Sequence, residues 1–446
     1  ITLYGTVDIG LQNQSHGAPI SDYFVGGSAE VVQKNSNRSV TGLTPSNLSQ
    51  SRVGIQGNEP IVGDWSGVFK LETFFNPQSG QIADAAKSLV QNNGRPLGTQ
   101  ADPGSQTTNV DSSASGQTFQ QALAGFSSKT FGTVTFGRQN TVLADGIAKY
   151  DPNYASQAFS LIGISGTTAG GGDTQNRRLD DSVKYVGTYG IPAGGAVHLS
   201  AEYKFNQANG GSANTAYEVS FGGEFAGFSG DVYYTKIHDA VSLAALSAAQ
   251  VADLATLCPN PIPAGGSCIA ASPSNALAAT ISDNTSYAFM GLYNMGFLKF
   301  FGGYEHIQYA NPNTPLVGGF NVAAYTVAYV NVQSGPKSTY LNDKDLQVFW
   351  AGIRWTVIPD LDLVGAYYGY KQDAYATGAD AGCSTKLAGT CSGTENVISL
   401  DADYRLTKRF DAYIGSMYSG VKDGLAAGYP YHTTDITTTL GVRFKF

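Results

Sequence analysis

Charged residues are scarce in this 446-residue chain: Asp, Glu, Lys and Arg together make up 13% of it, about half the usual ~25% of soluble domains. Uninterrupted apolar runs of about 18 residues are also missing, which excludes membrane-spanning helices. The mean hydropathy is −0.12. A closed β-barrel remains as a way to cross lipid, because its apolar residues alternate with polar ones.

Basic clusters are missing as well. The net charge is −8, and Lys and Arg are neither dominant nor grouped. We therefore expect no nucleic-acid partner. A strand pattern begins at Ile1, which we interpret as a mature N-terminus from which a leader has been removed.

The chain has only four cysteines, in two local pairs, Cys258/Cys268 and Cys383/Cys391. The pairs lack close C-x-x-C spacing and neighbouring histidines, so we expect no metal. Two loop disulfides formed in an oxidising compartment fit this spacing better. We expect no cofactor.

Glycine (55 residues), tyrosine (26) and phenylalanine (22) are abundant, and an alternating pattern is clearest at the C-terminus. From Ile436 to Phe446, apolar and polar or small residues alternate. A strand turns successive side chains to opposite faces, so this segment has one apolar and one wet face. Its length matches a tilted strand that crosses a bilayer, about 9–11 residues.

The same alternation recurs along the chain and predicts an all-β fold, a 16-stranded antiparallel transmembrane β-barrel formed by residues 1–446 as one unit. A soluble β-sandwich is the alternative, but it needs regular eight-to-twelve-residue spacing and an aromatic core. The predicted strands are 2–13, 50–58, 65–76, 117–127, 132–139, 180–188, 195–206, 216–225, 228–238, 285–294, 297–309, 345–357, 361–371, 394–404, 409–419 and 435–446.

Connections alternate between short turns and long polar segments, as hairpin topology in an outer-membrane barrel requires. The long segments include 140–179, and the cysteine-bearing 239–284 and 372–393, which we predict to be external loops. If apolar positions face lipid, parity places Arg52, Lys70, Glu72 and Lys184 inside. A charged interior in a barrel of this size indicates a water-filled pore.

Ordered motifs along the whole chain resemble the general, trimeric Gram-negative porins of the β-proteobacterial type. The motifs span residues 4–8, 51–57, 69–72, 131–139, 181–185, 410–413 and 441–446. The resemblance implies a homotrimer in outer-membrane lipid that passes small hydrophilic solutes and ions. It also implies that Phe446 is the C-terminal assembly signal, and that the third external loop, 140–179, folds inward to constrict the pore.

In that family, wall arginines face carboxylates of the inward loop. Arg52 and Arg178 occupy two wall positions, and Gln120 stands where a third arginine is usual, so that Lys70 compensates only in part. Arg138 and Arg177 either join this wall or anchor the base of the loop. The opposing carboxylates are Asp145, Asp151 and, less clearly, Asp173. Opposite fixed charges across a narrow pore create a transverse field. The alternative is that several of these charges only pin the loop to the wall.

Two other functions stay open at this point. A substrate-selective porin with a saturable site for sugars or carboxylates is compatible with the long loops and many tyrosines. A barrel hydrolase could use His198 and Ser200, which are two residues apart on one strand face. However, parity places both inside the pore, and no G-x-S-x-G motif is present. We therefore expect a channel, not an enzyme.

Overall fold

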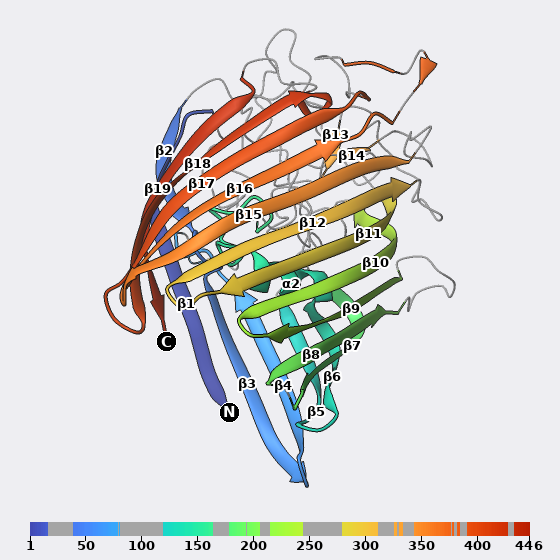
Figure 1. The fold of residues 1–446 in the computed structure, drawn as a ribbon, viewed down its shortest axis with the longest axis vertical. Coiled ribbons are helices and arrows are strands. Elements are labelled where there is room, and N and C mark those ends of the chain that lie inside the picture. The colour runs from blue at the N-terminus through green and yellow to red at the C-terminus, as the bar shows by residue number, and fades with distance from the viewer. Residues whose placement is uncertain are drawn as a thin grey trace, which may run out of the picture.

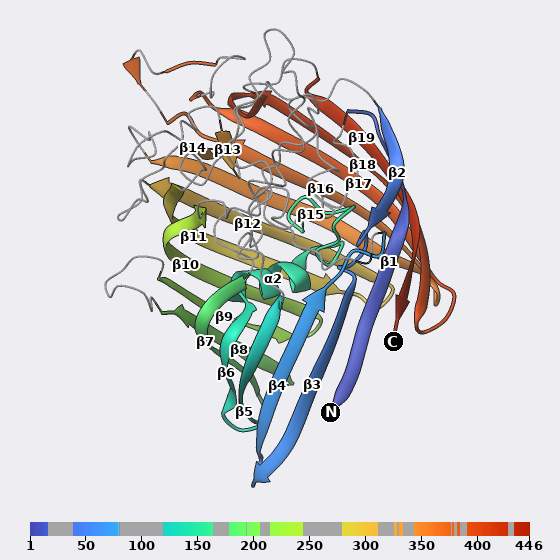
Figure 2. The same ribbon diagram turned by 180° about the vertical axis from the view of Figure 1, so that it is seen from behind.

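The computed structural model describes a closed antiparallel barrel, and one α-helix of the described residues lies inside it (Figures 1 and 2). Among the described residues, no helix is both long and apolar enough to cross a membrane. The described residues are 1–16, 39–78, 80, 119–163, 178–192, 194–205, 215–243, 279–310, 325–327, 330–332, 343–375, 377–378, 381–383, 390–426 and 432–446.

Seventeen strand segments form the barrel sheet. They are β1 (Thr2–Gln14), β2 (Val40–Pro45), β3 (Arg52–Val62), β4 (Trp65–Phe74), β5 (Gln121–Ser128), β6 (Gly132–Asn140), β7 (Arg178–Gly190), β8 (Gly195–Lys204), β9 (Ala216–Phe225), β10 (Phe228–Leu243), β11 (Ala279–Asn294), β12 (Leu298–Ala310), β15 (Lys344–Ile358), β16 (Leu361–Gln372), β17 (Gly393–Arg405), β18 (Phe410–Asp423) and β19 (Thr434–Lys445). A separate hairpin consists of β13 (Tyr325–Val327) and β14 (Val330–Val332), and η4 (Gly424–Ala426) follows β18.

The barrel has sixteen strands because β2 and β3 occupy the same edge of β1. β2 pairs with the end of β1, from Ile9 to Gln14, and β3 pairs with its beginning, from Thr2 to Thr6. On its other edge β1 pairs with β19, which closes the sheet. The predicted fold class is thus confirmed, but residues 40–45, expected in a loop, form the upper half of the second strand.

The break in this strand, residues 46–51, folds into the barrel. Ser46 has a positive φ of 60°, a conformation that a residue other than glycine seldom adopts. The buried Asp8 carboxylate stabilises the break by accepting hydrogen bonds from the backbone of Leu48 (2.8 Å) and Ser49 (2.9 Å). It also accepts one from the Tyr413 hydroxyl at 2.5 Å. An ionised acceptor with several donors can hold such an irregular backbone in place.

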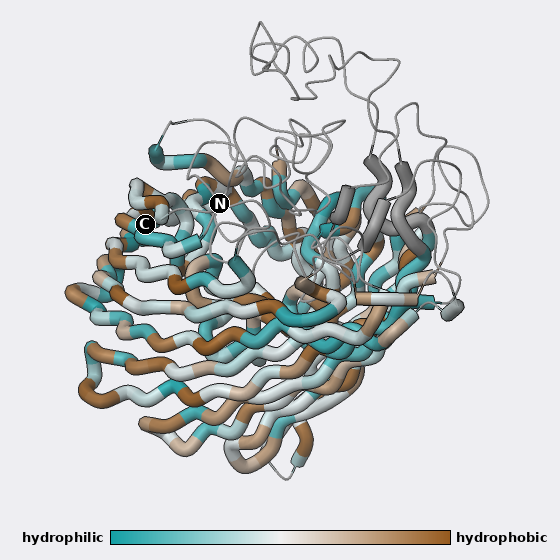
Figure 3. The backbone as a smooth tube through the Cα atoms, turned by 90° about the horizontal axis from the view of Figure 1, so that it is seen from above, coloured by the Kyte–Doolittle hydropathy of each residue, from teal (hydrophilic) through white to brown (hydrophobic). Residues whose placement is uncertain are grey.

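The alternation of side chains agrees with the predicted parity. Val53 and Ile55 of β3 and Leu199 and Tyr203 of β8 are exposed on the outer face. Figure 3 shows hydrophobic and hydrophilic residues alternating along the wall strands. Glu72 and Lys184, which parity placed inside, are buried in the barrel.

The two ends of the chain meet at the short-turn rim of the barrel, the rim that carries the turns between β3 and β4 and between β17 and β18 (Figure 1). Gly5 and Phe446 exchange two backbone hydrogen bonds, of 3.0 and 3.1 Å. The Phe446 ring lies over Gly5, where a Cβ would come within 2.3 Å of it and 2.7 Å of the Arg52 carbonyl oxygen. Glycine is therefore required at this seam.

Gly5→Val is expected to lower the yield of folded barrel, because overpacking of this kind costs about 1–3 kcal/mol. The measurement is the fraction of protein that still migrates as a folded barrel on detergent gels after the sample has been heated. Gly365→Val, in β16, is the matched control, since a Cβ there meets only an ordinary contact at 3.4 Å. Equal heat resistance of the two variants would contradict this account of the seam.

Cys383 and Cys391 form a disulfide with a Cα–Cα distance of 5.3 Å. It lies in the connection between β16 and β17, within the predicted loop 372–393. The other predicted pair, Cys258 and Cys268, lies outside the described residues.

Candidate functional site in the barrel lumen

The connection after β6 enters the lumen and begins with helix α2 (Val142–Tyr150). The Thr141 hydroxyl accepts a hydrogen bond from the Ala144 backbone at 3.1 Å, as an N-cap residue does. Glu218, from the wall strand β9, accepts a second one from the Leu143 backbone at 3.0 Å. This helix was not predicted, although Thr141 before an apolar stretch that ends in Lys149 is a helix signal.

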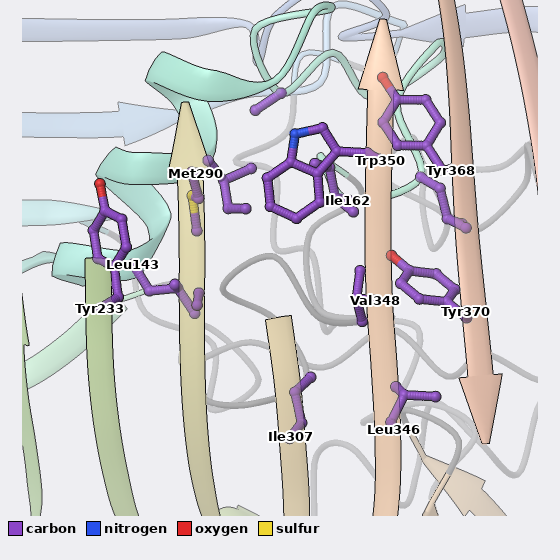
Figure 4. Close-up of a cluster of buried hydrophobic side chains, with 14 of the residues drawn as sticks. Leu143, Ile162, Tyr233, Met290, Ile307, Leu346, Val348, Trp350, Tyr368 and Tyr370 are labelled. Atoms are coloured by element: carbon purple, nitrogen blue, oxygen red, sulfur yellow. The ribbon is translucent and has the colours of Figure 1, made fainter. Parts of the chain in front are cut away.

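The apolar face of α2 packs on the wall formed by β10, β11, β12 and β15. Figure 4 shows Leu143 of the helix and Ile162 of the following segment next to wall residues such as Met290, Trp350 and Tyr368. The indole nitrogen of Trp350 also donates to the Tyr150 carbonyl at 3.1 Å. Burial of these side chains holds the helix inside the barrel, because apolar area removed from water stabilises the packed state.

The segment after the helix is tied to the break in the second strand. The Asn47 carbonyl oxygen accepts hydrogen bonds from the backbone of Gln157 (2.8 Å) and Ala158 (3.0 Å) and from the Ser156 hydroxyl (2.8 Å). This contact was not predicted, because the partners are more than 100 residues apart in sequence. The described part of the inward loop, 140–163, is therefore held on both sides of the lumen.

A group of basic side chains lies on β3, β4 and the start of β7, around the carboxylate of Glu72. Arg52 approaches Glu72 at 3.8 Å and Lys70 at 3.5 Å. Glu72 is only 1% exposed and also accepts hydrogen bonds from Tyr4 (2.8 Å) and Gln121 (3.2 Å). The side chain of Arg52 is 39% exposed. Glu72 thus orients the basic group and offsets one of its charges.

Arg178 lies next to this group but differs from the prediction that it lines the pore. It is 3% exposed, and its guanidinium lies 4.7 Å from the centre of the Phe74 ring. Its charge still interacts with Glu72. Arg178 contributes charge to the basic group from a covered position, whereas the side chains of Arg52 and Lys70 are 39% and 25% exposed.

Arg138 is also covered and forms an ion pair with Asp180 as well as a hydrogen bond to the Phe119 carbonyl at 3.0 Å. These contacts join β6 to β7 and to the residues that precede β5, and the role of Arg138 at the base of the loop stays a prediction. Arg177 and Asp173 lie outside the described residues.

Asp145 is the exposed carboxylate of α2. Its side chain is 51% exposed and pairs with Lys184 of β7 at 2.5 Å. It is also close enough to Lys70 for their charges to interact. Of the predicted acidic residues within the described chain, Asp145 therefore faces the basic group.

Asp151 was predicted to line the pore, and the structure contradicts this. It is completely buried between the loop and the wall, where it accepts hydrogen bonds from the Tyr368 hydroxyl and the Ala155 backbone, both at 2.7 Å. Burial raises the pKa of Asp151, although these hydrogen bonds act in the opposite direction. Asp151 therefore ties the loop to the wall, which is the alternative role of these charges.

The geometry does not support the hydrolase alternative at His198. Its Nδ1 lies 2.9 Å from Asp231 and its Nε2 3.7 Å from Glu224. Both nitrogens therefore face carboxylates, of β10 and β9 respectively, and neither is directed at Ser200. Within the described residues, no group of three or more His, Cys, Asp or Glu could hold a metal ion.

The family model for Gram-negative porins matches residues 1–424. This chain belongs to the Gram-negative porins. A porin is an outer-membrane channel with a multi-pass β-barrel, and the lumen described above is its pore. The described part of the inward loop, residues 140–163, lies in this lumen and carries Asp145 on α2.

Solved structures are similar to this porin over its whole length. The anion-selective porin from Comamonas acidovorans matches with a TM-score of 0.60 and 16% identity, covering 100% of this chain and 99% of that one. A trimer form of OmpT, an outer membrane protein of Vibrio cholerae, matches with a TM-score of 0.56 and 13% identity, covering 100% of this chain and 98% of that one. OmpF of Salmonella typhi, in complex with daunomycin, matches with a TM-score of 0.52 and 13% identity, covering 100% of this chain and 97% of that one. No curated protein sequence matches the chain.

Proposed function

We propose that this porin is a passive diffusion channel for small hydrophilic solutes and ions, with a modest preference for anions. The observation that carries the preference is the pairing of charges at the constriction. Arg52 and Lys70 both pair with Glu72, and the charge of Arg178 also acts on this carboxylate. On the other side, the exposed Asp145 is paired with Lys184.

Within the described basic group, Arg52 and Lys70 therefore place two positive charges beside one carboxylate. Fixed charges along a pore raise the local concentration of ions of opposite sign. The preference should be modest, because Glu72 offsets part of the basic group and because covered Arg178 acts only through space. The structural similarity to the anion-selective porin from Comamonas acidovorans supports a preference for anions over cations.

The test is conductance in planar bilayers. A diffusion channel gives ohmic current steps in KCl, and a KCl gradient should give a reversal potential displaced toward that of chloride. Liposome swelling with small sugars tests whether uncharged solutes pass. A lack of conductance would refute the channel function, and a reversal potential displaced toward potassium would refute the anion preference.

We also propose that the porin is a homotrimer and that Phe446 is its C-terminal assembly signal. The trimer form of OmpT, which shares this fold, supports the first. The position of Phe446 in the seam that closes the barrel supports the second. Three equal conductance steps per insertion and chemical cross-linking test the trimer. Deletion of Phe446, with the yield of folded protein in the outer membrane as the readout, tests the signal.

A further inference from the structure

Tyr154 is the exposed side chain of the segment that follows α2. From Asp151 to Gly163 the other residues are buried, whereas Tyr154 is 42% exposed. Tyr154 and Ala155 both have a positive φ, 51° and 58°, although non-glycine residues seldom adopt this conformation. Strained backbone that is retained at a pore surface suggests a functional constraint.

Two cations of the barrel wall lie beside this tyrosine. Lys299 of β12 and Arg354 of β15 are direct partners in the strand register. The Arg354 guanidinium lies 4.5 Å from the centre of the Tyr154 ring and donates to the Pro152 carbonyl at 3.1 Å. The Lys299 ammonium lies 3.4 Å from the Tyr154 hydroxyl.

These two cations differ in the carboxylates that lie near them. Arg354 pairs with Asp362 at 3.1 Å, but Asp362 also pairs with Arg405 at 2.7 Å. Asp401 is close enough to attract Arg354, but it is buried. No carboxylate of the described chain lies within ion-pairing distance of Lys299, whose polar contact is the Tyr154 hydroxyl. Lys299 therefore remains available to an anion.

We propose that the Tyr154 hydroxyl and the Lys299 ammonium form a binding site for small carboxylate anions. A carboxylate has two oxygens, and this site offers one donor to each, the hydroxyl and the ammonium. Arg354 behind the ring adds positive potential. This inference rests on the proposed diffusion channel and adds to it a saturable step, at a place separate from the basic group around Glu72.

The experiment compares single-channel conductance in potassium acetate and in KCl over a range of concentrations. In acetate, the wild-type conductance should saturate at a lower concentration than in KCl. Tyr154→Phe removes the hydroxyl and keeps the ring on Arg354, and Lys299→Gln removes the charge. Each should raise the half-saturating acetate concentration about three- to tenfold, as expected for the loss of one hydrogen bond to a charged group in a partly solvated site.

Lys371→Gln is the matched control, because it removes an exposed lysine of β16 that already pairs with Asp373 at 3.0 Å. It should leave the acetate curve unchanged. A wild-type acetate curve as linear as that in KCl overturns the site, as does an equal shift in the Lys371 control. Normal KCl conductance in every variant shows that the channel is folded. Absence of KCl conductance in the wild type would instead refute the diffusion channel itself.

Discussion

Trp350→Ala is expected to widen the constriction and leave the barrel folded. The indole is 3% exposed, packs in the cluster that includes Leu143 and Ile162, and donates to the Tyr150 carbonyl at 3.1 Å. Replacing a buried tryptophan by alanine costs about 3–5 kcal/mol. This cost falls on the packing of the inward loop, because the strand ladders on both sides of Trp350 remain paired.

The measurement is the swelling rate of proteoliposomes in sugars of increasing size, together with single-channel conductance. Larger sugars should enter the variant faster than the wild type, and the current should become noisier. Trp355→Ala is the matched control, because Trp355 belongs to the same strand but is 45% exposed on the outer face. If the Trp350 variant excludes the same sugars as the Trp355 control, the indole does not hold the loop.

Glu72→Gln and Arg52→Gln are expected to change ion selectivity in opposite directions. Glutamine at position 72 still accepts a hydrogen bond from Tyr4 but removes the carboxylate that offsets Arg52 and Lys70. The chloride-to-potassium permeability ratio should therefore rise. Glutamine at position 52 removes the exposed cation, and the ratio should fall. Partly solvated charges act with roughly 0.5–1 kcal/mol, so each change should be about two- to fivefold.

Reversal potentials in a KCl gradient measure both changes. Lys408→Gln, in the short turn between β17 and β18, is a control for charge outside the constriction and should have little effect. Shifts of the same sign in the Glu72 and Arg52 variants would mean that Glu72 is not the counter-charge of the basic group.

The strands could be predicted from sequence because their signal is local. Alternation at a period of two assigned Val53 and Ile55 to lipid and Arg52 to the lumen without knowledge of any partner. The charged interior and the pore followed from the same rule. Residues 40–45 were missed because the second strand is interrupted, and its break depends on Asp8, about 40 residues earlier in the chain.

The burial of individual charges could not be predicted, because it depends on partners that are distant in sequence. Asp151 and Arg178 carry the residue types that a pore lining requires. Tyr368, 217 residues away from Asp151, determines that this carboxylate anchors the loop. The Phe74 ring stacks against Arg178, which is buried. Parity states which face of the wall a side chain occupies, but not whether another segment covers it.

The break in the second strand has a consequence for engineering of the aperture. Residues 46–51 are a spacer between two paired half-strands. The Asn47 carbonyl in this spacer accepts the hydrogen bonds that hold one side of the inward loop. Lengthening or shortening this spacer would move this carbonyl while the ladders above and below stay in register. Pore diameter can thus be tuned from a part of the scaffold that no permeating molecule has to touch.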